Sequence, residues 1–547
     1  MQQDSSNVHP RQNRFSATLR QAMRTRINVI LRRKPIGRID AKRLQNILPK
    51  YVNYLESKLM NSANSEEEYT NPRDLEVRLH YLDKEVRALS HHRSHGLSAL
   101  PDTLLTQILL CLPTKDSVKT SLLSKRFRNL WLEVPGLELH SLDSSNPRAI
   151  NNFIDRFLEI NRESRLQKFN INYDECSVYL FRISELITEV IKRGVQKLDV
   201  VGTVRYWPHT KELMPVDIYK SNTLVSLKLA NVRMASPEFV VSMPCLKTMH
   251  LEAIITQDPL FIEKLLSGCP VLEDLTVFRV FNDNVPVLRV RSHCLKRFCV
   301  KFSRSVRIYG KEYTVEVDAP GLKYMNFRDD HSARVVVKNL SSLFMIDIDT
   351  QFGTGTLQMK KANISDFLTG ISSVRHMIIS QPTLEVLYSC MKPGPFTKFR
   401  NLTRLEASFC TGLLQNLPHF LDGFPKLKHL TLYLLYLKDL KPENLELTDV
   451  PQCLLRTLEC VEVKEVTTVE KAGKKRARNI RRTKVSKHKK KIWIEVLRYI
   501  LENSLVLKKL ILYFSSVTNS VLDISEALPT FTKLSPRCEI FNHLTSL

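Results

Sequence analysis

LVSLKLANVRMASPEFVVSMPCLKTMHLEAIITQDPLFIEKLLSGCPVLEDLTV, residues 224–277, contains three copies of the pattern LxxLxL, which begin at Leu224, Leu246 and Leu272. In each copy, apolar residues alternate with polar ones, which is the pattern of a half-buried strand. One such strand cannot bury its apolar edge alone, so successive copies must stack on one another. The stretch therefore predicts a curved solenoid of parallel strands.

The same pattern recurs through most of the chain. Successive copies begin 18 to 34 residues apart, except for one gap of 52 residues before the last copy. This is the period of leucine-rich repeats, in which a short strand is followed by a helix or an irregular return. We assign residues 150–448 to the solenoid and expect helices such as residues 258–266 on its convex side; the alternative is a mixed α/β domain with coincidental matches. The other copies begin at Leu166, Val195, Leu295, Leu322, Leu340, Val374, Leu402, Leu427, Leu455 and Leu507.

Residues between the leucines of each strand are expected to face the concave surface, because side chains alternate along a strand. Aromatic and arginine side chains are frequent anchors of protein interfaces. They are candidates for binding a target protein, and the alternative is that several face solvent and bind nothing. The candidates are His250, Phe278, Tyr324, Arg328, Phe344, His376, Arg404, His429 and Tyr433.

A second apolar stretch precedes the solenoid: LSALPDTLLTQILLCLPTKDSVKTSLLSKRFRNLWLEVPGLEL, residues 97–139. Pro101 suits the first turn of a helix, and Pro113 ends that helix. Thr114 and Ser124 are predicted to cap two further helices. The stretch is too small and too apolar to be a domain alone, which indicates a docking module.

This stretch resembles the F-box of plant proteins, although Ala99 and Phe127 depart from the residues that are common there. The resemblance implies a three-helix F-box over residues 95–140 that docks on a Skp-like adaptor and, through it, on a cullin. The matching adaptor-binding positions are Leu100, Pro101, Leu104, Ile108, Leu109, Leu112, Pro113, Val118, Leu122, Leu123 and Trp131.

Two further segments carry a related resemblance. LLSGCPVLEDL, residues 265–275, is typical of plant F-box proteins with leucine-rich repeats. Residues 449–541 resemble the FBD region of such proteins through DVPQCLLRTLECVEVKEV, EVLRYILENSLVLKKLILYF and SPRCEIF. Together these segments imply a plant F-box/FBD/leucine-rich-repeat protein.

The N-terminal part is predicted to be disordered over residues 1–15 and a helical bundle over residues 16–90, with three apolar faces at helical spacing. RTRINVILRR and YVNYLESKLMNSANSEEEYTNPRDLEVRLHYLDKE resemble a KIX-type coactivator domain. That resemblance implies a groove for an amphipathic activation helix; the alternative is an ordinary basic three-helix bundle. The faces are formed by Met23, Ile27, Ile30 and Leu31, by Leu44, Ile47, Leu48, Val52, Leu55 and Leu59, and by Leu75, Leu79, Leu82, Val86 and Leu89.

The net charge is +26, from 82 basic and 56 acidic residues, and much of the excess lies in residues 471–491, which contain no acid. We predict that this insert in the FBD region is a solvated loop. It is a candidate nuclear-localisation signal, which favours the nucleus over the cytoplasm; non-specific nucleic-acid contact and a plain loop are the alternatives. The candidate residues are Lys474, Lys475, Arg476, Arg478, Arg481, Arg482, Lys484, Lys487, Lys489, Lys490 and Lys491.

The chain contains none of the motifs GxxxxGK[ST], HExxH, GxSxG or GxGxxG, and its 11 cysteines are scattered without a CxxC. We therefore expect no catalytic centre, no metal or other cofactor, and reduced thiols. The N-terminus lacks the apolar region of a signal peptide, and no run is long enough to span a membrane.

These observations predict an α/β protein with a helical bundle, a three-helix F-box and a leucine-rich-repeat solenoid that ends in an FBD region. The predicted function is the substrate-recognition subunit of an SCF-type ubiquitin ligase, which is not itself an enzyme and binds an unknown protein target. The alternatives are a nuclear transcription-associated scaffold, which uses the KIX-like bundle and the basic loop, and an adaptor-binding protein with no ligase role.

Overall fold

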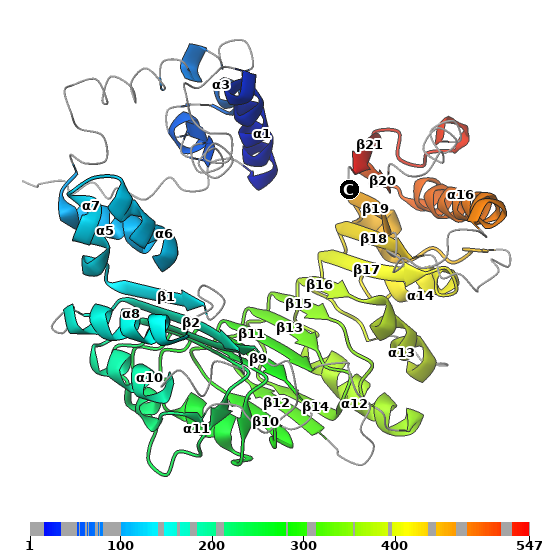
Figure 1. Cartoon of the computed structure of the whole chain (residues 1–547). Coiled ribbons are helices and arrows are strands. Elements are labelled where there is room, and N and C mark those ends of the chain that lie inside the picture. Colours follow the sequence, from blue (N-terminus) through cyan, green and yellow to red (C-terminus); the bar gives the residue numbers. More distant parts are fainter. Residues whose placement is uncertain are drawn as a thin grey trace, which may run out of the picture. The chain divides into compact units, whose positions relative to one another are not determined.

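A computed structural model of the chain (Figure 1) describes residues 16–33, 52–53, 55–60, 63, 65–71, 75, 77–79, 82, 100–140, 147–160, 165–174, 183–203, 213–280, 283–302, 313–353, 356–391, 397–435, 445–466, 478–515 and 528–545. Its contacts divide the chain into two compact units. The first comprises Met1–Cys111 and Thr120–Trp131, and the second comprises Leu112–Lys119 and Leu132–Leu547. The disorder predicted for residues 1–15 lies outside the described residues.

The first unit contains a small helical core. Its elements are α1 (Ala17–Arg33), helical residues within 52–60, α3 (Glu66–Thr70) and helical residues within 75–82. The predicted apolar faces meet in this core, whereas α3, which begins at the capping residue Ser65, was not predicted. The core consists of Met23, Ile27, Val52, Leu55, Leu59, Met60, Ala63, Tyr69, Leu75 and Leu79, with Leu19, Ile30 and Leu82 packed against it. The predicted Leu44, Ile47, Leu48, Val86 and Leu89, and the side chain of Leu31, lie outside the described part.

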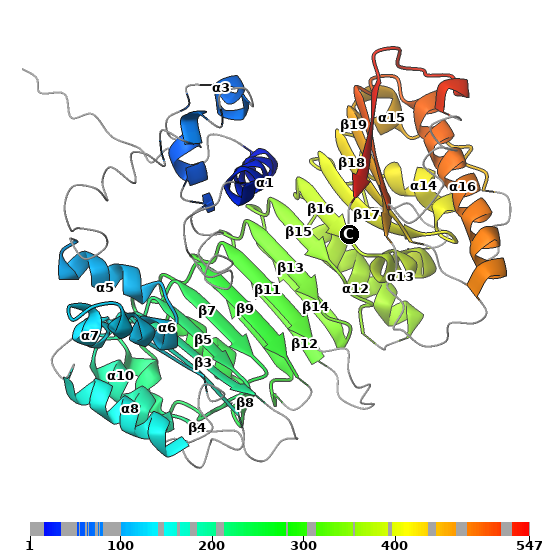
Figure 2. The same cartoon turned by 45° about the horizontal axis from the view of Figure 1, so that its top comes forward.

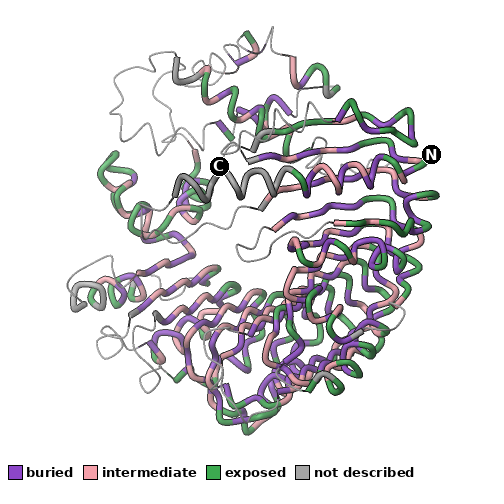
Figure 3. Tube along the Cα trace, turned by 90° about the vertical axis from the view of Figure 1, so that its right-hand side faces the viewer, coloured by how far each residue is buried: buried purple, intermediate pink, exposed green. Residues whose placement is uncertain are grey.

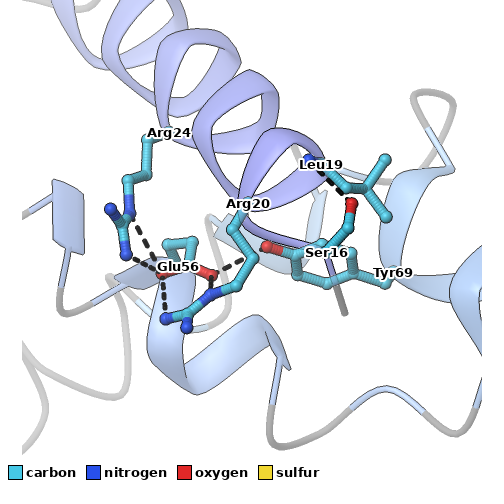
Figure 4. A network of polar contacts seen from close by, with 6 residues as sticks. All are labelled: Ser16, Leu19, Arg20, Arg24, Glu56 and Tyr69. Carbon is cyan, nitrogen blue, oxygen red and sulfur yellow. Dashed lines mark hydrogen bonds and ion pairs between the residues drawn. The ribbon is translucent and has the colours of Figure 1, made fainter. Parts of the chain in front are cut away.

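One buried carboxylate joins three segments of this bundle (Figure 4). Glu56 is fully buried and accepts hydrogen bonds from Arg20 Nε over 2.8 Å, Arg24 Nη2 over 3.1 Å and the Tyr69 hydroxyl over 2.8 Å. Burial alone would raise the pKa of Glu56, but the hydrogen bonds from Arg20, Tyr69 and Arg24 outweigh it and lower that pKa. The ionised carboxylate therefore ties α1 to both neighbouring segments.

The first unit also contains three helices of the predicted F-box segment. They are α5 (Asp102–Leu110), the 3-10 turn η2 (Thr120–Leu122) and α7 (Phe127–Leu130). Helix α7 contacts both α5 and η2. Phe127 and Leu130 of α7 and Leu105 of α5 are buried, so these short helices share an apolar interior. The predicted third helix begins at Phe127, a few residues later than the proposed cap Ser124.

The second unit is built on one sheet in which every strand pair is parallel (Figure 2). Chain order and sheet order agree, which is the topology of a solenoid. Its fifteen strands are β1 (Gly136–His140), β2 (Lys168–Asp174), β3 (Lys197–Thr203), β5 (Ser226–Ala230), β7 (Thr248–Glu252), β9 (Asp274–Arg279), β11 (Arg297–Phe302), β13 (Tyr324–Arg328), β15 (Met345–Ile348), β16 (His376–Ile379), β17 (Arg404–Cys410), β18 (His429–Leu435), β19 (Cys460–Val466), β20 (Lys509–Ser515) and β21 (Glu539–Thr545).

Successive strands of the main sheet are connected through a helix, as predicted, or through a further strand, where the sequence predicted an irregular return. The strand returns form two small parallel sheets, β4 (Leu213–Met214), β6 (Arg233–Met234) and β8 (Ile255–Thr256), and β10 (Val287–Arg291), β12 (Tyr313–Asp318) and β14 (Ser332–Lys338). The helical returns and flanking helices are α6 (Thr114–Lys119), η3 (Trp131–Glu133), α8 (Pro147–Ile160), α10 (Ile183–Lys192), η5 (Val216–Lys220), α11 (Phe261–Ser267), α12 (Leu357–Gly370), α13 (Gln381–Met391), η6 (Leu414–Asn416), α14 (Leu417–Leu421), α15 (Gln452–Arg456), α16 (Arg478–Asn503) and η7 (Leu528–Thr530). The predicted α/β solenoid is confirmed.

Burial alternates along the strands, as the sequence pattern predicts (Figure 3). In β9, Leu275 and Val277 are buried, whereas Asp274, Thr276 and Phe278 are half-buried. The leucines face the returns and form the core. The intervening residues face the opposite, concave side of the main sheet.

Two predicted repeat starts are wrong by three residues. The strand predicted from Leu340 follows the pattern that begins at Leu343, and the strand predicted from Leu455 follows the pattern that begins at Leu458. Both errors have one cause, a second leucine three residues upstream. Leu340 is buried before the strand, and Leu455 belongs to α15.

The solenoid also extends beyond its predicted limits. Strand β1 lies within the range assigned to the F-box, and it pairs with β2 in parallel. At the other end, β19, β20 and β21 of the FBD region pair in sequence with β18. The FBD region therefore continues the main sheet and does not form a separate layer.

The LLSGCP segment holds a close contact between consecutive repeats. A Cβ atom at Gly268 would lie 2.4 Å from the carbonyl oxygen of Val241, and the Gly268 carbonyl accepts from Met243 N over 2.8 Å. Gly268 has a φ of −87°, so the requirement for glycine is the space and not the backbone angle. This contact explains a glycine at the end of α11.

The predicted basic loop is wrong in its C-terminal part. Residues 478–491 form the first half of the 26-residue helix α16, while residues 471–477 lie outside the described residues. No glycine or proline interrupts residues 478–503, and lysine and arginine are good helix formers. The second half of α16 is anchored, because Trp493 is buried and the centre of its ring lies 5.0 Å from the centre of the Phe514 ring. Helix propagates readily from such an anchored turn, and α16 also fills the long gap between repeats.

Candidate protein-docking surfaces

Helix α5 of the F-box segment has two apolar sides. Leu105 and Leu109 are only 1% and 3% exposed, whereas Leu104 and Ile108 on the same helix are 51% and 41% exposed. An apolar side chain that remains in water forgoes the stabilisation of burial. The outer side of α5 is therefore a surface that another protein can cover.

The last residue of η2 and the residue that follows it are the most exposed apolar residues of this segment. Leu122 is 86% exposed and Leu123 is 58% exposed. Both belong to the first unit, as do Leu104 and Ile108. Since α5 and η2 both contact α7, these four side chains extend from one group of helices.

The structure divides the predicted adaptor-binding residues into three groups. Leu109 is buried within the chain and cannot contact a partner directly, because it lies one turn after Leu105 on the inner side of α5. The exposed residues are Pro101, Leu104, Ile108, Pro113, Leu122 and Leu123, and the half-buried residues are Leu100, Leu112, Val118 and Trp131.

Arg126 fixes the start of α5 beside α7. Its Nε donates to Asp102 Oδ1 over 3.0 Å, and its Nη2 donates to the carbonyl of Leu100 over 2.6 Å. A planar guanidinium suits such a two-point attachment. Arg126 therefore holds the backbone from which Pro101 and Leu104 are presented.

Thr114 has a different role from the predicted helix cap. It is the first residue of α6, and its hydroxyl accepts a hydrogen bond from Glu138 N over 2.7 Å. Glu138 lies on β1, the first strand of the main sheet. The contact satisfies a backbone donor at an edge that would otherwise be open.

The second candidate surface is the concave face of the main sheet. The predicted target-binding residues, Phe344 excepted, lie at strand positions that face it: His250 on β7, Phe278 on β9, Tyr324 and Arg328 on β13, His376 on β16, Arg404 on β17, and His429 and Tyr433 on β18. Phe344 directly precedes β15 and lies at the rim of the face, because it was placed from the wrong repeat start at Leu340.

Glu406 joins three of these residues on adjacent strands. It accepts hydrogen bonds from the Tyr433 hydroxyl over 3.1 Å and from Arg404 Nε over 3.3 Å, and its Oε1 lies 3.0 Å from His376 Nε2. The hydrogen bond with His376 is the largest cause that lowers the pKa of Glu406 to about 2. The group is a rigid platform of polar and aromatic side chains across β16, β17 and β18.

The rest of the concave face is also largely paired within itself. Asp347 accepts hydrogen bonds from Asn326 Nδ2 over 2.7 Å and from Arg328 Nη2 over 2.9 Å. Near the C-terminal end, Lys464 lies 2.7 Å from Glu462 and 4.7 Å from the centre of the Tyr513 ring. Such a surface is suited to a partner that matches its shape and its hydrogen bonds more than its net charge.

Sequence reasoning missed Glu406, Asp347 and Lys464, because only aromatic, histidine and arginine residues were collected, and it missed Tyr513, because the solenoid was predicted to end at residue 448. The signal was present, since each residue occupies an outward position of the same alternating pattern. The remaining sequence candidates, the basic residues of the insert, have side chains outside the described part, except Lys491, which is exposed.

Within the described ranges, no group of three or more histidine, cysteine or acidic residues could hold a metal ion. Among the same residues, no helix is both long and apolar enough to cross a membrane.

Three family models match the chain: the F-box domain over residues 97–138, the leucine-rich repeats of an FBD-associated F-box protein over 183–380, and the FBD over 446–512. A putative F-box/FBD/LRR-repeat protein of Arabidopsis thaliana is 47% identical over 457 residues, which cover 81% of this chain and 98% of that protein. An FBD-associated F-box protein of the same plant is 43% identical over 471 residues, with 81% and 98% covered. The solved ectodomain of a plant receptor kinase with leucine-rich repeats is 10% identical, covers 69% of this chain and 50% of that chain, and has a TM-score of 0.16.

The fold and the matched segments define an F-box protein with a leucine-rich-repeat solenoid. The chain belongs to the plant F-box/FBD/LRR-repeat family, as the sequence resemblance predicted. The three matched segments all lie downstream of residue 96, so the KIX-like character of the N-terminal bundle stays a prediction.

Proposed function

We propose that the chain is the substrate-recognition subunit of an SCF-type ubiquitin ligase. In this role the F-box docks on a Skp-like adaptor that is joined to a cullin, and other subunits transfer ubiquitin. The single observation that carries the proposal is the exposure of Leu122 and Leu123 within a matched F-box. Two neighbouring leucines in water favour a protein surface that covers them.

The concave face is the proposed site for the target protein. It offers side chains from successive strands, including the exposed Arg404, which donates to Glu406, and the exposed His429 on the next strand. The contribution of this chain is then to hold the target at a high effective concentration near the ligase. No catalytic group of its own is required for that role.

Affinity purification of the full-length chain from plant cells under proteasome inhibition tests both parts. We expect an adaptor and a cullin in the complex, together with ubiquitinated proteins that are lost from the Arg404→Ala/His429→Ala variant. That variant should keep the adaptor, because its changes lie on the solenoid. Recovery of the chain without adaptor or cullin contradicts the ligase role, and retention of every co-purifying protein by the variant contradicts the target site.

Entry into the nucleus is part of the same proposal. Residues 474–491 carry a dense run of lysine and arginine, which is the composition of nuclear-localisation signals. A fluorescent fusion of the full chain should accumulate in nuclei, and replacement of Lys487, Lys489, Lys490 and Lys491 by glutamine should return it to the cytoplasm. Unchanged nuclear accumulation of that variant contradicts the assignment.

A further inference from the structure

The residues that directly precede the strands form a row along one edge of the main sheet. The backbone fixes this row, because the carbonyl of Lys323 accepts from Phe344 N over 2.9 Å and from Met345 N over 3.0 Å, and the same pairing repeats from one strand to the next. The row therefore carries one residue per strand, at a spacing of about 4.8 Å. Six of its residues are exposed cations, which we call the basic rim: Lys247, Lys296, Lys323, Arg375, Lys428 and Lys508.

The acids on this row do not balance the basic rim. Glu273 pairs with Lys296 at 2.9 Å, and Glu459 pairs with Lys508 at 2.7 Å and with Lys428 at 3.6 Å. These pairings lower the pKa of Glu273, chiefly through Lys296, and of Glu459, chiefly through Lys508. For Lys247, Lys323 and Arg375, the part of the chain that the structure describes offers no carboxylate within 4.0 Å. The rim therefore keeps a positive excess, unlike the paired interior of the concave face.

An exposed aromatic pair lies in the middle of the basic rim. Tyr324 is 42% exposed and Phe344 is 44% exposed, and their ring centres are 6.3 Å apart at an interplanar angle of 70°. Phe344 occupies the rim position between Lys323 and Arg375, and Tyr324 directly follows Lys323. One pair of exposed aromatic rings thus lies between cations of the basic rim.

We propose that the basic rim binds single-stranded nucleic acid, which is a function beyond the ligase role. Lys323, Arg375 and their neighbours contact the phosphates, and Tyr324 and Phe344 stack on unpaired bases. Phosphate contacts explain the positive excess, and base stacking explains why bulky rings remain exposed within it. A duplex hides the faces of its bases, and an acidic polypeptide has no bases to stack, so the aromatic pair favours a single strand over both.

Fluorescence anisotropy with the full-length chain tests the proposal. The probes are a single-stranded RNA and a single-stranded DNA of about 20 nucleotides, the duplex of the same DNA, and polyglutamate as a competitor. We expect both single strands to bind more tightly than the duplex, and polyglutamate to compete poorly. A higher affinity for one of the two single strands identifies whether RNA or DNA is the natural ligand.

Two variants separate charge from stacking. Lys323→Gln/Arg375→Gln should weaken binding about tenfold and make the slope of log affinity against log salt shallower by about 1.4, since each phosphate contact on a single strand contributes about 0.7. Tyr324→Ala/Phe344→Ala should weaken binding at least about fivefold and leave that slope unchanged. Lys338→Gln/Lys361→Gln, which removes the same charge from exposed positions on β14 and α12, is the matched control and should bind like the unmodified chain.

Several results overturn the proposal: no binding of either single strand, equal binding of the duplex, full competition by polyglutamate, or an equal loss in the control variant. An aromatic variant that binds normally also overturns it, because the rim would then attract any polyanion. All of these substitutions lie in the second unit, so a thermal unfolding transition of the solenoid like that of the unmodified chain is the check that each variant is folded.

Discussion

The Tyr433 hydroxyl on β18 donates a 3.1 Å hydrogen bond to Glu406 on β17, and this contact links two adjacent strands on the concave face. Glu406 is only 14% exposed, so the contact is largely shielded from water. We expect Tyr433→Phe to lower the free energy of unfolding by about 1 kcal/mol. In a double-mutant cycle with Glu406→Gln the two losses should be less than additive, and additive losses in chemical denaturation would show that the two residues act independently.

The same carboxylate predicts a pH dependence. The pKa of Glu406 is lowered to about 2 in the folded chain from an ordinary value of 4.5. A lowered pKa means that the stabilisation is fully present above about pH 4.5 and is lost as the pH falls towards 2. The difference in melting temperature between the unmodified chain and Glu406→Gln should therefore be constant near neutral pH and shrink below pH 4.5. A difference that grows in acid would contradict this account.

The buried Glu56 should likewise stabilise the N-terminal bundle. Glu56→Gln leaves Arg20 and Arg24 without their anionic partner, which we expect to destabilise the bundle by about 2–3 kcal/mol. The loss should appear as faster hydrogen exchange in α1 of the full-length chain. Glu67→Gln, at an exposed position of α3, is the matched control and should leave the exchange unchanged.

The sequence predicted the solenoid because its signal is repeated many times, and an error in one copy does not disturb the others. The errors occur where a single copy must be placed alone. Leu340 and Leu343 both fit the repeat, and only the backbone pairing of Met345 with Tyr324 decides between them. Because of that one ambiguity, Phe344 was predicted to lie on the concave face, whereas it lies at the rim.

The docking surfaces were less predictable than the fold. Helical spacing marked both sides of α5 as apolar, but it could not tell that Leu109 faces inward and Ile108 faces outward. Likewise, a run of cations favours a solvated segment, and it gave no sign of the anchored turn at Trp493 from which α16 extends. Both outcomes depend on tertiary contacts that a local pattern does not contain.

Gly268 tests the packing of consecutive repeats. Gly268→Ala places a Cβ atom 2.4 Å from the carbonyl oxygen of Val241, and that backbone must then move. We expect a loss of roughly 2 kcal/mol or more in the free energy of unfolding, as for other overpacked sites. Ser267→Ala, one residue earlier at an exposed position, should change stability by less than about 0.5 kcal/mol. Similar stability of the two variants would show that the contact relaxes without cost.

The affinity of the full-length chain for a purified Skp-like adaptor is the most direct test of the central claim that the exposed leucines of the F-box are a docking surface. Leu122→Ala/Leu123→Ala should weaken binding about 30-fold or more, since truncation of a central interface anchor costs about 2 kcal/mol. Val240→Ala/Leu505→Ala removes two apolar side chains that are 87% and 53% exposed elsewhere in the chain, and should bind normally. Unchanged adaptor affinity of the Leu122→Ala/Leu123→Ala variant, or no affinity of the unmodified chain, would contradict the account.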